Sequence, residues 1–452
     1  MVVGPPRPVP TADAVTDSST PLPEASSGAR ASVPMHRLQW ADKVLGLTSC
    51  LALQPLNWLR RATRGRRRPS EGGPQRLLMI KFWGIGSLQL LTPAAARLRH
   101  EYPGAQLTLL TLSQNGPGAR AFGVFDEVLT LDVGSAGWGV VFGRIVGLIR
   151  RLRRRRFDAV FDFEFFTRFS AIISVLTGAP ETHGFESPNV WRGRFHTRRV
   201  PFNRYWHVAR NFRVLAGGDG SDPVGPEDLS SLRFEAQDHR HVRELLGDIA
   251  GRDAGYVVLN PNAGQLSLER RWPRMQFAEL AERMWREEGV GIALIGGPGE
   301  RAWTAGLAEL IRLRAPGIPV EDLSGRLSIT ELAALLAHAR ACISNDSGPM
   351  HLAAALSTPT VGLFGPETPI MYQPLGASVR SLYEPPACSP CINVHDNKVA
   401  NCIYGRPECL VNLTVERVET ELERLVRGPL LQPVKRPAAA DRTAEKRSEA
   451  EA

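Results

Sequence analysis

The sequence predicts an α/β protein built from two successive parallel sheets, each covered by helices on both faces. Three observations support this fold class. Short apolar runs typical of buried strands alternate with longer helical segments. The alternation occupies residues 76–163 and begins again at residue 256. Between them, residues 217–225 read GGDGSDPVG, a turn-rich segment that suits a domain boundary.

The first run begins with Arg76–Phe82 (RLLMIKF), whose nearly continuous apolar character is typical of a buried parallel strand. Gly84-Ile85-Gly86 then turns into a helix from about Leu88 to Tyr102. A dinucleotide-binding fingerprint is not completed, because Gln89 occupies the place of its third glycine. Further strands are predicted at Gln106–Leu112, Glu127–Leu131 and Ala159–Phe163, with a helix at Val140–Arg153.

The second run repeats this order of strand and helix. We predict strands at Tyr256–Asn260 and Gly291–Ile295, and helices at Ala236–Gly251, Met275–Glu288 and Leu327–Ala339. The predicted domains are therefore residues 76–235 and 236–428. Residues 1–34 and 429–452 have the composition of disordered segments, and residues 35–75 form a separate amphipathic and basic segment.

The most informative stretch is Cys342–Glu367, which contains an apolar strand, a polar turn, a small-residue helix and a second apolar strand. Asp346, Ser347 and Gly348 are typical helix-capping residues, and Pro349 suits the first helical position. The start of such a helix offers unpaired N–H groups and a positive dipole end, which together attract phosphate. His351 lies in the first turn. The alternative is a capped core helix with a buried histidine.

Residues 345–366, NDSGPMHLAAALSTPTVGLFGP, resemble the donor-site signature of the ADP-heptose:lipopolysaccharide heptosyltransferases, glycosyltransferase family 9. The resemblance extends from about Leu77 to Val426. It implies the GT-B fold, in which two Rossmann-like domains with parallel sheets face each other across a cleft. The first domain would bind the acceptor and the second the nucleotide sugar. A closing helix at Leu413–Val426 would cross back to the first domain.

The resemblance also implies the donor site. Backbone amides near Asn262 and Gly264 can approach phosphate, and Arg270 stands where the family has a donor-phosphate lysine. Glu300 matches the ribose-contacting glutamate. The predicted donor-binding residues are Asn262, Gly264, Arg270, Arg271, Gly297, Glu300, Asp346, Ser347, Gly348, Pro349 and His351.

The implied reaction is an inverting, metal-independent transfer of a sugar, with heptose from ADP-heptose as the expected donor. The acceptor would be the lipopolysaccharide core or a related lipid-linked glycan, and no cofactor is required. Negative charge accumulates on the leaving diphosphate. A helix N-terminus, Arg270 and His351 would offset it by fixed electrostatics in place of a metal.

The main departure from the family pattern is Gly86-Ser87, because the family has Gly-Asp there and that aspartate is its proposed catalytic base. A serine has no useful basicity near neutral pH. Glu164 and Asp162, near Arg168 at the end of a predicted strand, are the candidate replacements. The alternative for them is a structural ion pair with arginine. Ser87 also leaves open a second function, a nucleotide-sugar-binding relative without transferase activity.

The net charge of +9 is unevenly distributed. Residues 1–75 hold ten basic against five acidic residues, and Arg150–Arg156 holds six arginines, so the remainder is slightly acidic. This argues against a nucleic-acid partner and suggests attraction to anionic lipid or glycolipid. The arginine run is either a solvated helix end or a site that steers an anionic acceptor.

Residues 40–59 combine an apolar pattern with arginines that follow at 60, 61, 64 and 66–68. Gln54, Pro55 and Asn57 interrupt the pattern, which falls short of the ~20 residues of a bilayer span. The segment is therefore either an interfacial anchor or a solvated extension. No secretory signal is evident. We expect a cytoplasmic protein at the inner face of the cytoplasmic membrane, with peripheral membrane contact.

Four of the six cysteines, Cys388, Cys391, Cys402 and Cys409, have the spacing C-x2-C-x10-C-x6-C. This spacing is compatible with a structural zinc site. The alternative is a thiol-containing loop on the acceptor side. Disulfides are not expected in a reducing compartment.

Overall fold

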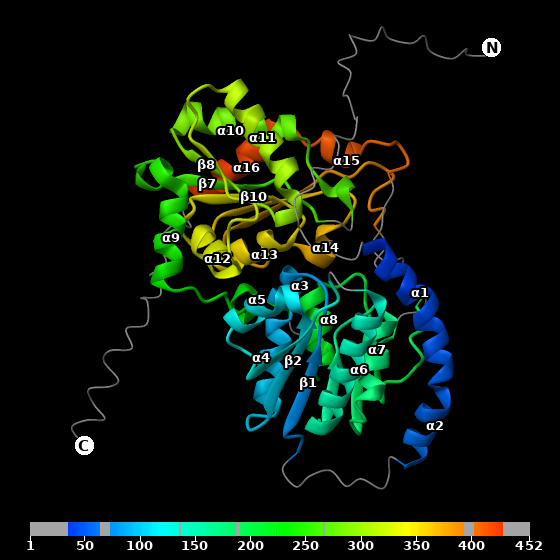
Figure 1. Cartoon of the computed structure of the whole chain (residues 1–452). Coiled ribbons are helices and arrows are strands. Elements are labelled where there is room, and N and C mark those ends of the chain that lie inside the picture. Colours follow the sequence, from blue (N-terminus) through cyan, green and yellow to red (C-terminus); the bar gives the residue numbers. More distant parts are fainter. Residues whose placement is uncertain are drawn as a thin grey trace, which may run out of the picture.

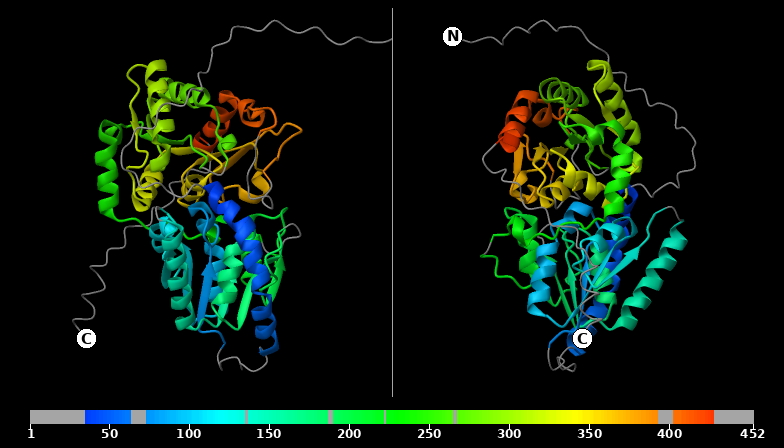
Figure 2. Two further views of the ribbon diagram at one scale, coloured as in Figure 1. Left: turned by 45° about the vertical axis from the view of Figure 1, so that its right-hand side comes forward. Right: turned by 90° about the vertical axis from the view of Figure 1, so that its left-hand side faces the viewer.

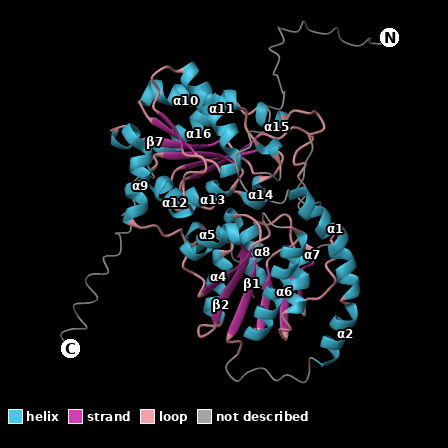
Figure 3. Ribbon diagram, viewed as in Figure 1, coloured by secondary structure: helices cyan, strands magenta, loops and turns pink. Residues whose placement is uncertain are grey.

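The structure is a computed structural model that describes residues 35–63, 73–134, 137–186, 190–221, 223–264, 267–392 and 402–427. It contains two α/β domains, one above the other, each with a six-stranded parallel sheet between layers of helices (Figures 1 and 3). The two-sheet prediction is confirmed. The predicted disordered ends, 1–34 and 429–452, and the arginines at 64 and 66–68 lie outside the described residues.

The first sheet has the strand order β3-β2-β1-β4-β5-β6. Its middle strands are buried on both faces, as their continuous apolar sequences predict. The strands are β1 (Arg76–Ile80), β2 (Gln106–Leu112), β3 (Glu127–Leu131), β4 (Ala159–Asp162), β5 (Glu181–Glu186) and β6 (Arg198–Pro201). The helices are α3 (Ile85–Gln89), α4 (Thr92–Glu101), α5 (Gly116–Ala121), α6 (Trp138–Arg155), α7 (Arg168–Leu176) and α8 (Val208–Leu215).

The helix predicted over Leu88–Tyr102 is divided into α3 and α4. Pro93 has no N–H, so the carbonyl of Gln89 lacks its usual helical donor. The hydroxyl of Thr92 donates to that carbonyl instead, at 2.8 Å. The break turns α4 away from α3 and leaves α3 as a short helix directly after the β1 loop.

The second sheet has the order β12-β11-β10-β7-β8-β9. Its strands are β7 (Tyr256–Asn260), β8 (Gly291–Leu294), β9 (Val320–Asp322), β10 (Ala341–Asn345), β11 (Thr360–Phe364) and β12 (Val379–Tyr383). Its helices are α9 (Ala236–Leu246), α10 (Arg274–Glu288), α11 (Arg301–Arg314), α12 (Ile329–His338), α13 (Gly348–Ala355), α14 (Pro369–Tyr372), α15 (Glu408–Val411) and α16 (Val415–Arg427). The face that carries α12 and α13 is directed toward the first domain (Figure 1).

The closing helix α16 does not cross back to the first domain, contrary to expectation. Val418, Leu422 and Leu425 join the core on the far side of the second sheet, where α16 packs on α10 and β11. The strong amphipathic pattern of this helix therefore serves the second domain alone.

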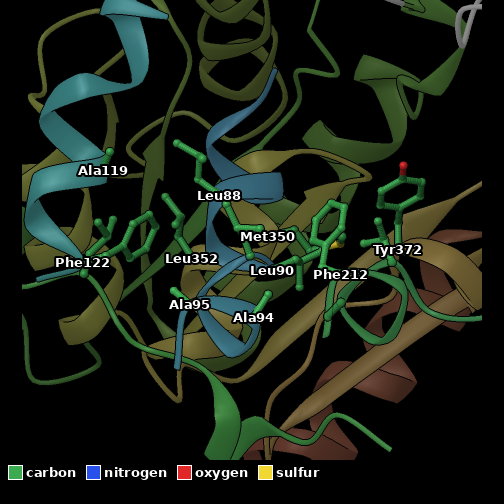
Figure 4. Close-up of a cluster of buried hydrophobic side chains, with 14 of the residues drawn as sticks. Leu88, Leu90, Ala94, Ala95, Ala119, Phe122, Phe212, Met350, Leu352 and Tyr372 are labelled. Carbon is green, nitrogen blue, oxygen red and sulfur yellow. The ribbon is translucent and has the colours of Figure 1, made fainter. Parts of the chain in front are cut away.

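One apolar core connects the two domains. Leu88 and Phe122 of the first domain belong to the same cluster of buried side chains as Met350, Leu352 and Tyr372 of the second (Figure 4). Burying large apolar side chains contributes about 1.5–3 kcal/mol each. The packing therefore holds α3 against α13 and fixes how the two sheets face each other.

Two helices, α1 (Met35–Ala52) and α2 (Gln54–Thr63), precede β1 and run along the side of the first domain (Figures 1 and 2). Residues 40–59, which were expected to form an interfacial anchor or a solvated extension, belong to both helices. Pro55 has no N–H and so cannot bond to the carbonyl of Leu51, which ends α1 near Leu53. Within the described ranges, no helix combines the length and the apolar content needed to cross a bilayer.

Candidate active site

A cleft of about 570 Å³ lies between the carboxyl ends of the strands of both sheets. Loops that follow β1 and β4 line it from the first domain, and loops that follow β7, β8, β10 and β11 line it from the second. This edge is where open α/β sheets bind ligands. All predicted donor-binding residues except Arg271 line the cleft: Asn262, Gly264, Arg270, Gly297, Glu300, Asp346, Ser347, Gly348, Pro349 and His351.

The turn between β10 and α13 lines the part of the cleft that is predicted to bind the donor, which we call the donor side. The helix begins at Gly348, one residue before the predicted start at Pro349, and Ser347 is its N-cap. The Ser347 side chain does not cap the helix; its hydroxyl accepts a hydrogen bond of 2.6 Å from Asn260 Nδ2. The first amides of α13 are therefore not bonded by that hydroxyl, and they lie at the cleft surface with the positive end of the helix dipole.

Arg270 connects two of the donor-side loops. Its Nη1 donates to the carbonyl of Asp346 at 2.8 Å and lies 3.3 Å from the Asp346 carboxylate. Its Nη2 donates to the carbonyl of Ala263. Trp272, two positions further along the chain, is fully buried, and its indole N–H donates to the Leu413 carbonyl at 2.8 Å, so the base of the loop is fixed.

Arg271 points elsewhere, contrary to the prediction. Its guanidinium stacks on the Trp303 ring, 4.6 Å from the ring centroid, and burial lowers its pKa. Arg270 ends a 3-10 turn (Leu268–Arg270) and Arg271 has an extended backbone, so the two side chains point in different directions and only Arg270 reaches the cleft.

Two polar groups complete the donor side. Asn262 is buried and its Nδ2 donates to the Ile295 carbonyl at 2.9 Å. The buried Oδ1 of Asn262 has no hydrogen-bond partner among the described residues and could accept one from a ligand. Glu300 Oε2 accepts from the Gly297 amide at 2.8 Å, which orders the glycine turn after β8.

The loop after β1 touches the donor turn directly. A Cβ placed on Gly86 would lie 2.7 Å from the His351 ring and 2.9 Å from the Cα of Gly348. Only glycine allows this approach. Ser87, at the position of the family's aspartate, lines the cleft beside this contact.

Asp162 is a structural residue and does not line the cleft, contrary to the prediction that it could act as a base. It is fully buried and ion-paired with Arg192, and it accepts from Ser170 Oγ at 3.1 Å. His196 Nε2 lies 3.2 Å from it. Burial alone would raise the pKa of Asp162, but Arg192, His196 and Ser170 together lower it.

Glu164 is likewise fully buried and does not line the cleft. Its Oε1 accepts from Lys81 Nζ at 2.8 Å and from the Phe82 amide at 2.7 Å. Arg168, expected near these carboxylates, pairs instead with Asp42 of α1. The structural ion-pair interpretation therefore fits both carboxylates, with Lys81 and Arg192 as their partners.

Sequence reasoning missed Glu367, which lines the cleft just after β11 and is 3% exposed. Its Oε1 accepts from the Thr368 amide at 3.1 Å. Burial, followed by the charges of Glu367 and Asp346, raises the pKa of Tyr372 well above its usual value, so these groups lie close together. Glu367 follows β11, one of the strands whose carboxyl ends border the cleft, and this position in the sequence could have indicated it as a site residue.

The four clustered cysteines border a pocket of about 80 Å³. Burial, and then the neighbouring thiols, raise the pKa of Cys409 to about 11. In the part of the chain that the structure describes, no three His, Cys, Asp or Glu side chains are arranged to hold a metal. The zinc prediction gains no support from these side-chain positions.

Comparison with known sequences agrees with this geometry. The profile of glycosyltransferase family 9 (heptosyltransferase) matches residues 145–400, more than half of the chain. Lipopolysaccharide heptosyltransferase 1 of Pseudomonas aeruginosa is 31% identical over 291 residues, which are 62% of this chain and 77% of that protein. Lipopolysaccharide heptosyltransferase 2 of Escherichia coli K12 is 30% identical over 371 residues, 78% of this chain and 98% of that protein.

Solved structures share the two-domain fold. A family 9 glycosyltransferase of Veillonella parvula has a TM-score of 0.63 at 20% identity and covers 78% of this chain and 97% of its own. E. coli ADP-heptose lps heptosyltransferase II has a TM-score of 0.59 at 20% identity, with 78% and 98% covered. The GT-B prediction is confirmed. The chain therefore belongs to glycosyltransferase family 9 and is a glycosyltransferase.

Proposed function

We propose that this protein transfers heptose from ADP-heptose to the lipopolysaccharide core or a related lipid-linked glycan. The observation that carries the proposal is the convergence of Arg270, Glu300 and the α13 N-terminus on one cleft. The names of the relatives, lipopolysaccharide heptosyltransferases 1 and 2, support the sugar and the acceptor class. Their similarity does not favour the second hypothesis, a sugar-nucleotide-binding protein without transferase activity.

The donor side suits a nucleoside diphosphate. The amides and dipole of α13 attract the diphosphate, and Arg270 can exchange its contact with Asp346 for a bidentate contact with phosphate. His351, in the first turn of α13, would approach the same oxygens. Glu300 would accept from ribose hydroxyls, and Asn262 Oδ1 is a further acceptor in the same cleft.

Transfer requires the anomeric bond to the diphosphate to break while an acceptor hydroxyl attacks from the opposite side. The diphosphate leaves with the bonding electrons, so negative charge grows beside Arg270 and the α13 amides. Fixed dipoles and cations directed at this position stabilise the transition state. We therefore assign an inverting reaction that needs neither a metal nor another cofactor.

Glu367 is our proposed catalytic base. The described carboxylates that line the cleft are Glu300, Asp346 and Glu367. Glu300 orders the Gly297 amide and Asp346 contacts Arg270, so both serve the donor side. Glu367 lies in the same cleft beside Tyr372, and its carboxylate would take the proton of the attacking hydroxyl as the new glycosidic bond forms.

The acceptor in this proposal is an anionic glycolipid at the inner face of the cytoplasmic membrane, and the protein is cytoplasmic. The arginine run of α6 does not supply the acceptor site, because Arg155 and Arg151 contact Glu127 of β3. We therefore interpret the arginine run as a solvated helix end.

The decisive experiment measures acceptor-dependent release of ADP. Purified protein is incubated with ADP-heptose and with lipopolysaccharide core that lacks heptose, and the product is identified by mass spectrometry. We expect release of ADP and a mass increase of one heptose. Binding of ADP by calorimetry without any transfer would instead support the non-transferase hypothesis, and the absence of ADP binding would remove both.

A further inference from the structure

Helices α1 and α2 attach to the first domain through polar groups. The carboxylate of Asp42 accepts from the amides of Arg168 and Phe169, each at 2.9 Å, and so caps the start of α7. Gln54 Nε2 donates to the Gly193 carbonyl at 3.0 Å, and Arg60 donates to the Ala179 carbonyl at 2.6 Å. These bonds fix which face of each helix is turned toward the domain.

The inward face also carries small and polar residues. Gly46 packs against the Arg168 side chain, Cys50 is fully buried, and Asn57 is 5% exposed. Leu53 adds an apolar contact to a small cluster that contains Phe195. The spacing of these positions, three or four residues apart, defines one continuous stripe along both helices.

The outward face is apolar, the reverse of an ordinary surface helix. Trp58 is 72% exposed, Leu51 is 57% exposed and Leu45 is 54% exposed. Other large apolar residues exposed on the two helices are Val44, Leu47, Leu56 and Leu59. Contiguous apolar surface of this kind is uncommon on proteins that contact only water, and it marks an interaction site.

The charge of residues 43–70 indicates what kind of partner the apolar face binds. From Lys43 to Ser70 the sequence contains seven basic residues and no acidic residue. Arg194, next to the carbonyl that Gln54 contacts, is also exposed. An apolar helix face that is followed in the sequence by a run of arginines is complementary to an anionic lipid surface, where apolar side chains enter the interface and arginines bind phosphate groups.

We infer that the outward face of α1 and α2 docks on an anionic phospholipid bilayer. In this arrangement the helices lie in the plane of the interface, because neither combines the length and the apolar content needed to cross a bilayer. The pair runs from the level at which the two domains meet along the side of the first domain (Figure 2), and the cleft lies between those domains. Docking therefore brings the mouth of the cleft to the surface where a lipid-linked acceptor presents its sugars.

The test is flotation of the full chain with vesicles of phosphatidylcholine alone or mixed with phosphatidylglycerol. We expect binding to the mixed vesicles that weakens with added salt. The double substitution Leu51→Gln and Trp58→Gln removes two exposed apolar side chains and should reduce partitioning at least ~10-fold. The matched control is Leu313→Gln on α11, whose side chain is 73% exposed and which should bind like the wild type.

Two controls separate membrane docking from the transferase reaction. Thermal melting checks that the variants fold, and turnover of a soluble, delipidated acceptor should be unchanged in the double variant. Docking is overturned if the wild type does not float with anionic vesicles, or if the double variant binds them as well as the control. It is also overturned if light scattering shows that the face joins two copies and that the double substitution separates them.

Discussion

Gly86 and Gly348 meet across the cleft, one at the start of α3 and the other at the start of α13. A Cβ on Gly86 would lie 2.9 Å from the Cα of Gly348, and a Cβ on Gly348 would lie 3.3 Å from the Gly86 nitrogen. Helix α3, which carries Ser87, and the turn between β10 and α13 are therefore in direct contact. We therefore expect a substitution on either side of this contact to change how the proposed site binds a diphosphate.

The first prediction concerns Gly86→Ala. The added methyl group must displace the His351 ring and the Gly348 backbone, and backbone yields less readily than a flexible side chain. Overpacking of this kind costs about 1–3 kcal/mol of folding stability. Because the displaced groups line the proposed donor site, we expect a comparable cost in the donor complex, which is a loss of about 5- to 150-fold in kcat/KM for the donor. Steady-state kinetics measure the loss. Gly147→Ala in α6, where an added Cβ meets nothing within 4 Å, should leave kinetics unchanged.

The second prediction separates Arg270 from Arg271. Arg270→Ala removes a charged donor directed at the diphosphate position, and hydrogen bonds to charged groups contribute about 1.5–3 kcal/mol. The dissociation constant for ADP should therefore rise by about 10- to 150-fold, as measured by calorimetry. Arg271→Ala is the control, because that side chain stacks on Trp303 outside the cleft. Equal losses in the two variants would contradict this assignment of the donor site.

Most of the predicted donor-binding residues line one cleft, and their convergence has a physical reason. Asn262, Gly297 and Asp346 each follow a strand of one parallel sheet, so strand ends alone place them at the same edge. The direction of a single side chain is not determined in this way, and Arg271 was misplaced for that reason.

The first domain was harder to predict because its ion pairs join distant segments. Asp162 and Arg192 are thirty positions apart, and only the path of the chain around β5 brings them together. Glu164 is likewise ion-paired with a distant residue, Lys81, which directly follows β1. Glu367 follows β11 of the second sheet, whereas the family's Gly-Asp position lies in the first domain, so the resemblance does not point to Glu367.

The third prediction concerns Glu367→Gln. The amide keeps the size of the side chain but cannot accept the proton of the acceptor hydroxyl, and general-base catalysis contributes about 10²- to 10⁴-fold. We expect kcat to fall by at least ~100-fold, with ADP affinity and melting temperature nearly unchanged. The loss should be smaller at high pH, where more acceptor is deprotonated without help.

Two comparison variants sharpen this result. Glu164→Gln leaves Lys81 buried without its charge partner, and breaking a buried pair costs about 3–5 kcal/mol, so its defect should be in unfolding by urea. Ser87→Asp, added to Glu367→Gln, restores a carboxylate at the family's base position and should recover part of kcat. Full activity of Glu367→Gln, with turnover lost in folded Glu164→Gln, would return the base assignment to Glu164.

The fourth prediction is a loss of stability in mild acid that involves His207, a residue that joins the domains. Its Nδ1 accepts from the Ala209 amide at 3.3 Å, so the proton resides on Nε2, which lies 3.0 Å from the Gln373 carbonyl of the second domain. Burial lowers the pKa of His207 from 6.5 to about 4. The unfolded chain therefore binds this proton first as the pH falls below 6.5, which favours unfolding down to about pH 4.

The free energy of unfolding should fall by up to about 1.4 kcal/mol per pH unit because of this group. Urea titrations between pH 6.5 and 4 measure this dependence on pH, and His207→Gln should make it less steep. Buried His183 also has its pKa lowered to about 4, so the His207→Gln variant should still lose some stability as the pH falls. If the variant loses stability as steeply as the wild type, His207 does not stay neutral in the folded protein.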